Sequence, residues 1–430
     1  MVSQKAHNEL SDLIPEKIDR SKDIHGFGKT CMTAFAQIQT TQNHTKRKKA
    51  FMKLLSLNSS SRYIPDIISC LDKISGEWKE GDILEFSKQM NYFTFTAFNQ
   101  ILFGKDLEYI SSHKVDYINH SNNTVKLEFR EFFICMAKDL AYSWVHPLTL
   151  ILPILNEFDL VNPFKRNLKN IDTFRATLKE FTAKCEDQDS IFFQLRENSD
   201  NKEDEIFEDL IFFMLGGTET SSHAITSAIF YLKKNASVLE KLLGELEKNG
   251  FTRSVQKVEN YTIDNIHKLD YLSYVVKESL RIDNPTTDSL KYEAKENVTI
   301  CGVPISKGSK IGIDILPSHY NPNEWQCPQE FIPERFDPES EYYKKPETDK
   351  NLKEGKSKSR AFMSVPFSYG ERKCPGQTFA LLEIRVALIF LLTRFDFGIS
   401  DEILQKEGNG YAIGTEVDLS VMVNKIFSMA

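Results

Sequence analysis

The chain has 430 residues, of which 41% are hydrophobic and 27% are charged, and its formal net charge is -7 at pH 7. This composition is typical of a globular protein with a substantial core and excludes a disordered or fibrous chain. The modest acidic charge argues against a nucleic-acid-binding protein, which needs a basic face.

Seven cysteines are scattered along the chain, with no CxxC pair among them. An odd, scattered set of this kind predicts reduced thiols in a compartment that faces the cytosol. Apolar stretches such as 386–392 are far shorter than the roughly 18 residues that a membrane span needs. Charged residues throughout the first 20 positions argue against a signal peptide. We therefore expect no membrane span in this chain.

Helical periodicity dominates the first two thirds of the chain. Apolar residues recur three and four apart between 207 and 229, which predicts a long helix. That helix contains the motif LGGTETSS, residues 215–222. Two adjacent glycines each weaken a helix by roughly 1 kcal/mol relative to alanine, a cost that is tolerated where the backbone must approach a large flat group.

The polar residues of this motif suit proton transfer. The Thr220 hydroxyl can bond back to a preceding carbonyl and loosen the helix enough to admit water. The Glu219 carboxylate can exchange protons with solvent. The alternative is a plain helix break with capping hydroxyls.

A second motif, KESLR, places Glu278 and Arg281 three apart and therefore on one helix face. Elsewhere, such a pair would be a surface ion pair worth only a few tenths of a kcal/mol.

The pattern changes to short alternating pieces between 290 and 316. Gly302 and Gly308 are turn signals there, so we expect a small sheet. A second strand pair is expected near 411–423. There is no internal repeat and no Gly/Ser linker, so we expect one mainly helical domain with small sheets over residues 1–430.

The tract from Lys344 to Arg360 carries seven basic and three acidic residues. It is interpreted either as a solvated surface loop or as a docking surface.

The stretch FSYGERKCPG, residues 367–376, comes directly before an apolar helix. Taken alone, Cys374 would more often be a small buried residue. However, a helix N-terminus together with Arg372 and Lys373 favours the thiolate form, and a thiolate is either a nucleophile or a metal ligand.

The stretch also resembles the haem-binding loop of the cytochrome P-450 family. The matching residues are Phe367, Gly370, Arg372, Cys374 and Gly376. The resemblance implies a cofactor, haem b, whose iron takes its axial thiolate from Cys374. It also implies that Arg372 pairs with a haem propionate.

Three further segments resemble the same family in the same order. LGGTETSS is similar to its oxygen-activation segment, which implies that Glu219 and Thr220 form a proton relay. KESLR and the later PERF motif are similar to its buried brace of Glu278, Arg281 and Arg335. HYNPNEW, which begins at His319, is similar to a connecting segment in which this histidine packs and caps a turn.

Other positions depart from the family pattern. His44 stands where a tryptophan is usual, and Lys48 stands where an arginine would contact a propionate. A basic, solvated helix face is an equal alternative for these two residues. The usual proline after the Glu/Arg pair is displaced to Pro285, so the segment from Thr286 onward is expected to be shaped differently.

The clearest resemblance covers residues 44–430. Eukaryotic members carry an anchor, a first helix and most of a sheet before this point. The short N-terminus implies either a truncated product or a trimmed member with an open substrate entrance.

The resemblance implies a haem-thiolate monooxygenase that inserts one atom of O2 into an apolar organic substrate. An NADPH-dependent flavin reductase or a similar redox partner is expected on the proximal face, with cytosol-facing association at the endoplasmic reticulum. The expected pocket residues are Phe212, Leu215, Gly216, Thr286, Tyr411 and Ala412. The alternatives are an isomerase that rearranges peroxides, a haem-binding protein without turnover, and a cysteine-nucleophile enzyme without haem.

Overall fold

The structure is a computed structural model, and it describes residues 4–21, 33–145, 164–252, 258–287, 289–343, 363–404 and 419–425. The chain divides into two compact units. The first unit comprises Met1–Asp19, Ser60–Ser87 and His223–Ala430, and the second comprises Arg20–Ser59 and Lys88–Ser222. The single-domain organisation stays a prediction.

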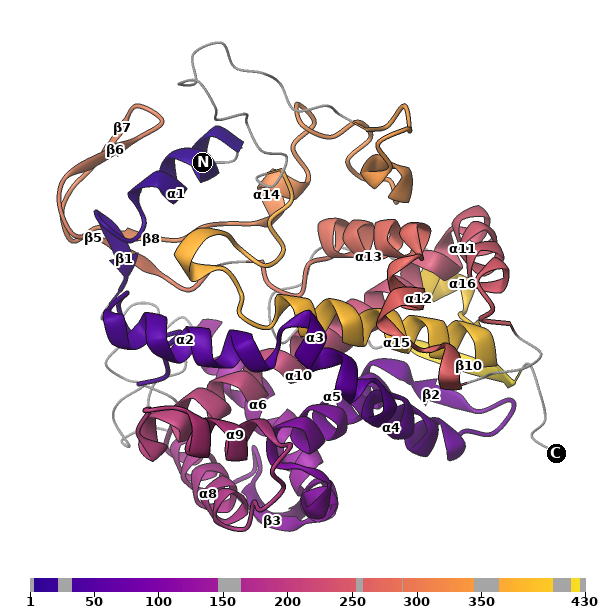
Figure 1. Cartoon of the computed structure of the whole chain (residues 1–430), viewed down its shortest axis with the longest axis horizontal. Coiled ribbons are helices and arrows are strands. Elements are labelled where there is room, and N and C mark those ends of the chain that lie inside the picture. Colours follow the sequence, from indigo (N-terminus) through magenta and orange to yellow (C-terminus); the bar gives the residue numbers. More distant parts are fainter. Residues whose placement is uncertain are drawn as a thin grey trace. The chain divides into compact units, whose positions relative to one another are not determined.

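Helices make up most of the described chain, as the sequence predicts (Figure 1). The α-helices are α1 (Gln4–Leu13), α2 (Gln42–Leu54), α3 (Leu57–Ser60), α4 (Ile64–Gly76), α5 (Phe86–Phe103), α6 (Phe129–Val145), α8 (Phe164–Ala183), α9 (Ile191–Asn198), α10 (Glu203–Lys234), α11 (Ala236–Lys248), α12 (Ile263–His267), α13 (Asp270–Ile282), α14 (Leu316–His319), α15 (Gln377–Arg394) and α16 (Asp401–Leu404). Short 3-10 turns include η6 (Pro333–Phe336) and η8 (Gly370–Arg372). No helix of the described residues is long and apolar enough to cross a membrane.

The strands form small sheets. They are β1 (Ile18–Arg20), β2 (Ile83–Glu85), β3 (Lys114–Ile118), β4 (Thr124–Glu128), β5 (Tyr292–Ala294), β6 (Val298–Ile300), β7 (Val303–Ile305), β8 (Lys310–Ile311), β9 (Phe395–Gly398) and β10 (Ser420–Lys425). The orders are β1-β5-β8, β2-β10-β9, β3-β4 and β6-β7.

The sheet predicted between 290 and 316 is confirmed by β5 to β8 in the first unit. Gly302 and Gly308 have φ values of 79° and 84°, which only glycine adopts at low cost. Of the strand pair predicted near 411–423, one strand is described, β10, which pairs antiparallel with β9 and β2. Residues 411–418 lie outside the described residues.

Helix α15 follows the cysteine loop, residues 367–376, as predicted and is buried along most of its length. Apolar residues surround its axis, which is typical of a core helix. In the first unit it packs against α4, and the Tyr63 and Phe379 rings meet edge to face at 6.3 Å.

Helix α10 is continuous from residue 203 to residue 234. Its first turn is acidic and its last turn holds Lys233 and Lys234, which complements the helix dipole at both ends. The helix break considered for the Gly-Gly motif is therefore wrong, because regular helix runs through it.

Candidate active site

The cysteine loop is held by its own backbone in the first unit. The Cys374 N–H donates to the Phe367 carbonyl at 2.9 Å, and the Lys373 N–H donates to the Gly370 carbonyl at 3.1 Å. Ser368 and Gly370 adopt φ values of 57° and 62°, a left-handed conformation that glycine adopts without strain. These bends bring the chain back on itself just before α15 begins.

Cys374 lies half-buried in front of that helix. By contrast, Cys70 and Cys185 are buried, as expected of cysteines that only fill space. The helix is preceded by Gly376, which offers no side-chain cap, so the first-turn N–H groups favour a negative charge nearby. A Cβ atom at Gly376 would lie 4.0 Å from the Cys374 sulfur, so glycine keeps the space beside the sulfur open.

These features fit a haem group. A half-buried sulfur near a positive helix end can serve as a thiolate ligand. Room beside that sulfur suits a flat macrocycle, and a cation two residues away suits a propionate. The fit rests on Cys374, Arg372 and Gly376, with Phe367 and Gly370 shaping the loop.

Arg372 is buried, with 2% of its side chain exposed, and forms an ion pair with Asp19 at 2.8 Å. This bond from Nη2 occupies one of the five N–H donors of a guanidinium. No sequence signal pointed to Asp19, which lies 353 positions away in the chain. Pairing of Arg372 with a propionate stays a prediction.

The relay motif lies in the second unit, on α10. The Thr220 hydroxyl donates to the Gly216 carbonyl at 2.5 Å, which confirms the predicted back-bonding. Both Glu219 and Thr220 are partly exposed. Glu219 can therefore exchange protons with water, although the relay itself stays a prediction.

The two glycines of the motif have different roles. A Cβ atom at Gly216 would meet nothing within 4 Å, whereas one at Gly217 would lie 3.0 Å from the Phe98 ring of α5. Only Gly216 therefore fits the expected open approach. Gly217 is explained by close packing between two helices of the second unit.

Two side chains of α5 that the sequence did not single out hold this part of α10. Thr94 donates to the Thr218 carbonyl at 2.9 Å. Ser222 donates to Asn91 at 2.7 Å. The polar residues within the otherwise apolar segment 86–103 are the sequence signal from which buried polar contacts could have been expected.

The structure brings the three residues of the predicted brace together in the first unit. Glu278, Arg281 and Arg335 are all fully buried. Glu278 accepts from Arg281 at 2.7 and 2.8 Å and from Arg335 at 3.0 Å. Arg281 also donates to the His319 and Pro328 carbonyls at 2.8 and 2.9 Å. Buried charges of this kind are tolerated because almost every donor meets an acceptor.

His319 connects the brace to the segment before the cysteine loop. Its Nε2 accepts from the Val365 N–H at 3.0 Å, so the proton is on Nδ1, which donates to the Arg281 carbonyl at 3.1 Å. Burial lowers the pKa of this imidazole to about 3. The histidine is neutral and fully engaged, which confirms the packing and capping role.

Helix α2, in the second unit, buries His44 and Lys48. The solvated-face alternative is therefore wrong for these two residues. His44 lies edge to face with the Phe35 ring at 6.0 Å. The sequence did not single out Arg47, which pairs with buried Asp209 at 2.6 Å and so occupies the same buried side of the helix.

The expected pocket residues are only partly described. Phe212 is half-buried, Leu215 is buried and Gly216 is exposed in the second unit, while Thr286 is half-buried in the first. Tyr411 and Ala412 lie outside the described residues. Cys374 also belongs to a different unit from Glu219 and Thr220, so their meeting in one site stays a prediction.

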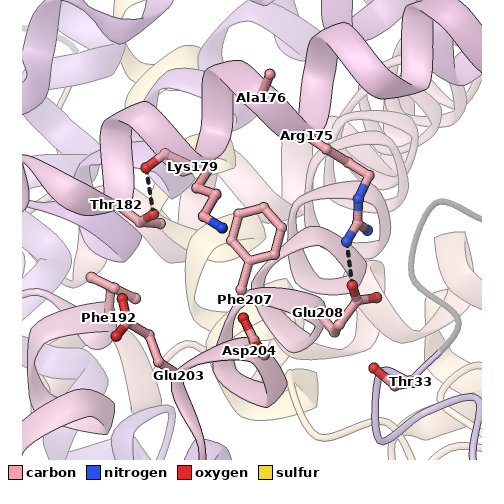
Figure 2. Close-up of a pocket in the computed structure, with 10 residues that line it drawn as sticks. All are labelled: Thr33, Arg175, Ala176, Lys179, Thr182, Phe192, Glu203, Asp204, Phe207 and Glu208. Atoms are coloured by element: carbon pink, nitrogen blue, oxygen red, sulfur yellow. Dashed lines mark hydrogen bonds and ion pairs between the residues drawn. The ribbon is translucent and has the colours of Figure 1, made fainter.

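A separate groove of about 350 Å³ lies in the second unit, between α8, α9 and the start of α10 (Figure 2). Its walls carry charged groups, including Arg175, which pairs with Glu208 at 2.5 Å. None of the predicted site residues lines it, and its charged lining does not match the apolar pocket expected from the sequence.

Comparison with known proteins identifies the family of this chain. The family model described as Cytochrome P450 matches residues 17–415. Cytochrome P450 3A28 of Bos taurus is 27% identical over 332 residues, covering 75% of this chain and 60% of the relative. Cytochrome P450 CYP82J17 of Trigonella foenum-graecum is 28% identical and covers 88% and 72%. Tabersonine 3-oxygenase of Catharanthus roseus is 32% identical and covers 48% and 38%.

The matched part of the chain thus spans about 60% of the length of the first mammalian relatives. The family model nevertheless covers most of this chain, and the structure is mainly helical with small antiparallel sheets. The chain belongs to the cytochrome P450 family, whose members are haem-thiolate monooxygenases.

Proposed function

We propose that the chain is a haem-thiolate monooxygenase that inserts one atom of O2 into an apolar organic substrate and reduces the other atom to water. The observation that carries this proposal is the cysteine loop. It combines a half-buried Cys374, a backbone bond to Phe367 and an uncapped helix start in a member of this family.

Haem b would be held by Cys374, with Arg372 and Lys48 facing its propionates and His44 in the place of the usual tryptophan. When bound, the haem would supply the iron that activates oxygen, and the Cys374 thiolate would donate electron density that favours this chemistry. The protein contributes ligation, orientation and a controlled supply of protons.

Proton supply is proposed for Glu219 and Thr220. Glu219 is partly exposed, so it can take protons from solvent and pass them toward the buried side of α10. The Thr220 hydroxyl, which donates to the Gly216 carbonyl, has one donor and two acceptor positions. It can accept a proton on a lone pair and pass its own on when it exchanges the carbonyl for a new acceptor.

Electrons are proposed to come from an NADPH-dependent flavin reductase or a similar redox partner on the proximal face. The basic tract from Lys344 to Arg360 precedes the cysteine loop in sequence and would attract an acidic partner, although it lies outside the described residues. Cytosol-facing association with the endoplasmic reticulum is proposed from the resemblance to eukaryotic members.

The test is the absorption spectrum of the haem-loaded, reduced protein under carbon monoxide. We expect the red-shifted band of a thiolate-ligated haem. O2 uptake with NADPH and a flavin reductase is measured on the same preparation. A normal spectrum without uptake would favour the isomerase or the non-turnover alternative, and the absence of the thiolate band would contradict the proposed function.

A further inference from the structure

The N-terminal segment, α1 and β1, lies close to the cysteine loop at three points within the first unit. His7 Nδ1 lies 3.3 Å from the Tyr369 hydroxyl. A Cβ atom on Gly370 would come within 3.7 Å of the Ser11 hydroxyl. Asp19 pairs with Arg372. Residues far apart in sequence thus come together at three positions of the loop, between 369 and 372.

The segment has its own anchorage. Leu10 and Ile18 are buried in one cluster with Tyr292, Ile300 and Ile313. Figure 1 shows α1 and β1 beside β5 and β8, and β1 forms the edge of that sheet. A strand that pairs within a sheet and packs into a core has little freedom to move, because packing and the backbone hydrogen bonds of the sheet hold it in place.

The Asp19–Arg372 pair is the strongest of the three contacts. Both side chains are 2% exposed, and their charged atoms are 2.8 Å apart. A buried, charge-assisted bond to one terminal nitrogen restricts the orientation of a guanidinium. An arginine whose orientation is already restricted loses less conformational freedom when it binds a second carboxylate.

We propose that Asp19 is a positioning residue that orients Arg372 toward a haem propionate, which makes the N-terminal segment part of the cofactor-binding machinery. This inference rests on the proposed function, because it takes the propionate as the second partner of Arg372. Asp19 acts through Arg372 and is not itself a ligand.

The test compares haem dissociation from the holoprotein of full chain length, followed as transfer to an excess of apomyoglobin. Asp19→Asn should release haem about tenfold faster, the lower end of the effect seen when an outer-shell partner of a metal site is lost. Glu16→Gln is the matched control, because Glu16 is an exposed carboxylate on the same segment, and it should leave the rate unchanged.

A double variant distinguishes positioning of Arg372 from a merely structural role of Asp19. In the Arg372→Gln protein, adding Asp19→Asn should cause no further acceleration, because the residue through which Asp19 acts is gone. If Asp19→Asn does not fold, Asp19→Glu preserves the charge on a longer side chain and should release haem faster than wild type does.

Unchanged release in Asp19→Asn, or equal acceleration in both backgrounds, would overturn the proposal. Slower release would also overturn it, since it would show that Asp19 competes with the haem for Arg372. Failure of the proposed function would instead be visible in the carbon monoxide spectrum of the wild-type protein, whatever the variants do.

Discussion

The brace in the first unit and the relay motif in the second are both polar groups set into helices, yet they are built in opposite ways. Glu278, Arg281 and Arg335 are fully buried and share a dense set of hydrogen bonds. Glu219 and Thr220 are partly exposed, and beside them Gly216 faces open space.

The buried brace is suited to stabilising the fold, whereas the partly exposed relay motif is suited to proton transfer. A buried cluster of charges holds one geometry, because breaking any bond leaves a desolvated charge without compensation. A proton relay needs access to water and a side chain that can change partners. We therefore expect substitutions in the brace to change stability and haem content, and substitutions in the relay to change the course of the reaction.

Removing the centre of the brace should have the largest effect on stability. Glu278→Ala leaves Arg281 and Arg335 buried without their shared carboxylate, and we expect a loss of roughly 3 to 5 kcal/mol in the free energy of unfolding. Urea unfolding measures it, together with haem content. Glu330→Ala is the control, because the exposed Glu330 contributes only its carbonyl to the same cluster. A stable, fully haem-loaded Glu278→Ala protein would show that the brace is dispensable.

The pH dependence of stability also tests the buried cluster, through His319. Burial holds the pKa of His319 at about 3 in the folded state, below its ordinary value of about 6.5. Below pH 6.5 this histidine therefore binds a proton in the unfolded chain but stays neutral in the folded chain. The free energy of unfolding consequently falls as the pH falls below 6.5. This group alone should lower the free energy of unfolding by about 2 kcal/mol between pH 7 and pH 5.

The measurement compares urea unfolding at the two pH values in the wild type and in His319→Gln. The variant should lose about 2 kcal/mol less than the wild type over this range. His267→Gln is the control, because His267 is exposed. Parallel pH profiles of the wild type and His319→Gln would contradict a neutral, buried imidazole.

Breaking the relay should have a smaller effect, and not on stability. Thr220→Ala should bind haem normally but direct electrons to peroxide, because proton delivery is impaired. We expect product formation per NADPH to fall several-fold, because the competing release of peroxide becomes faster than the productive path. Thr173→Ala is the matched control, since Thr173 makes the same back-bond to the carbonyl four residues earlier, on α8. Unchanged coupling in Thr220→Ala would place the relay elsewhere.

Much of this architecture could be predicted from the sequence, because local signals determine it. Apolar periodicity predicted α10 and α15, and glycine turns predicted β5 to β8. The KESLR and PERF motifs predicted the brace, since Glu and Arg three apart share a helix face whatever surrounds it.

Long-range partners could not be predicted in the same way. Nothing near Asp19 marks it as a partner of the cysteine loop. The polar residues of segment 86–103 indicate a buried polar contact but do not identify α10 as the partner of Asn91, because these contacts arise only from tertiary packing. The difference between Gly216 and Gly217 is of the same kind. Adjacent glycines are indistinguishable in sequence until the position of the Phe98 ring is known.

Cys374 is the residue on which the account depends, and Cys374→Ser tests it most directly. A serine hydroxyl does not ionise near neutral pH and cannot supply the same electron density to iron. The reduced, carbon monoxide-bound spectrum is recorded for the wild type, for Cys374→Ser and for the control Cys327→Ser, whose cysteine is exposed. We expect the thiolate band in the wild type and in Cys327→Ser and its loss in Cys374→Ser, whereas a Cys374→Ser protein that keeps the band would show that this sulfur does not bind the iron.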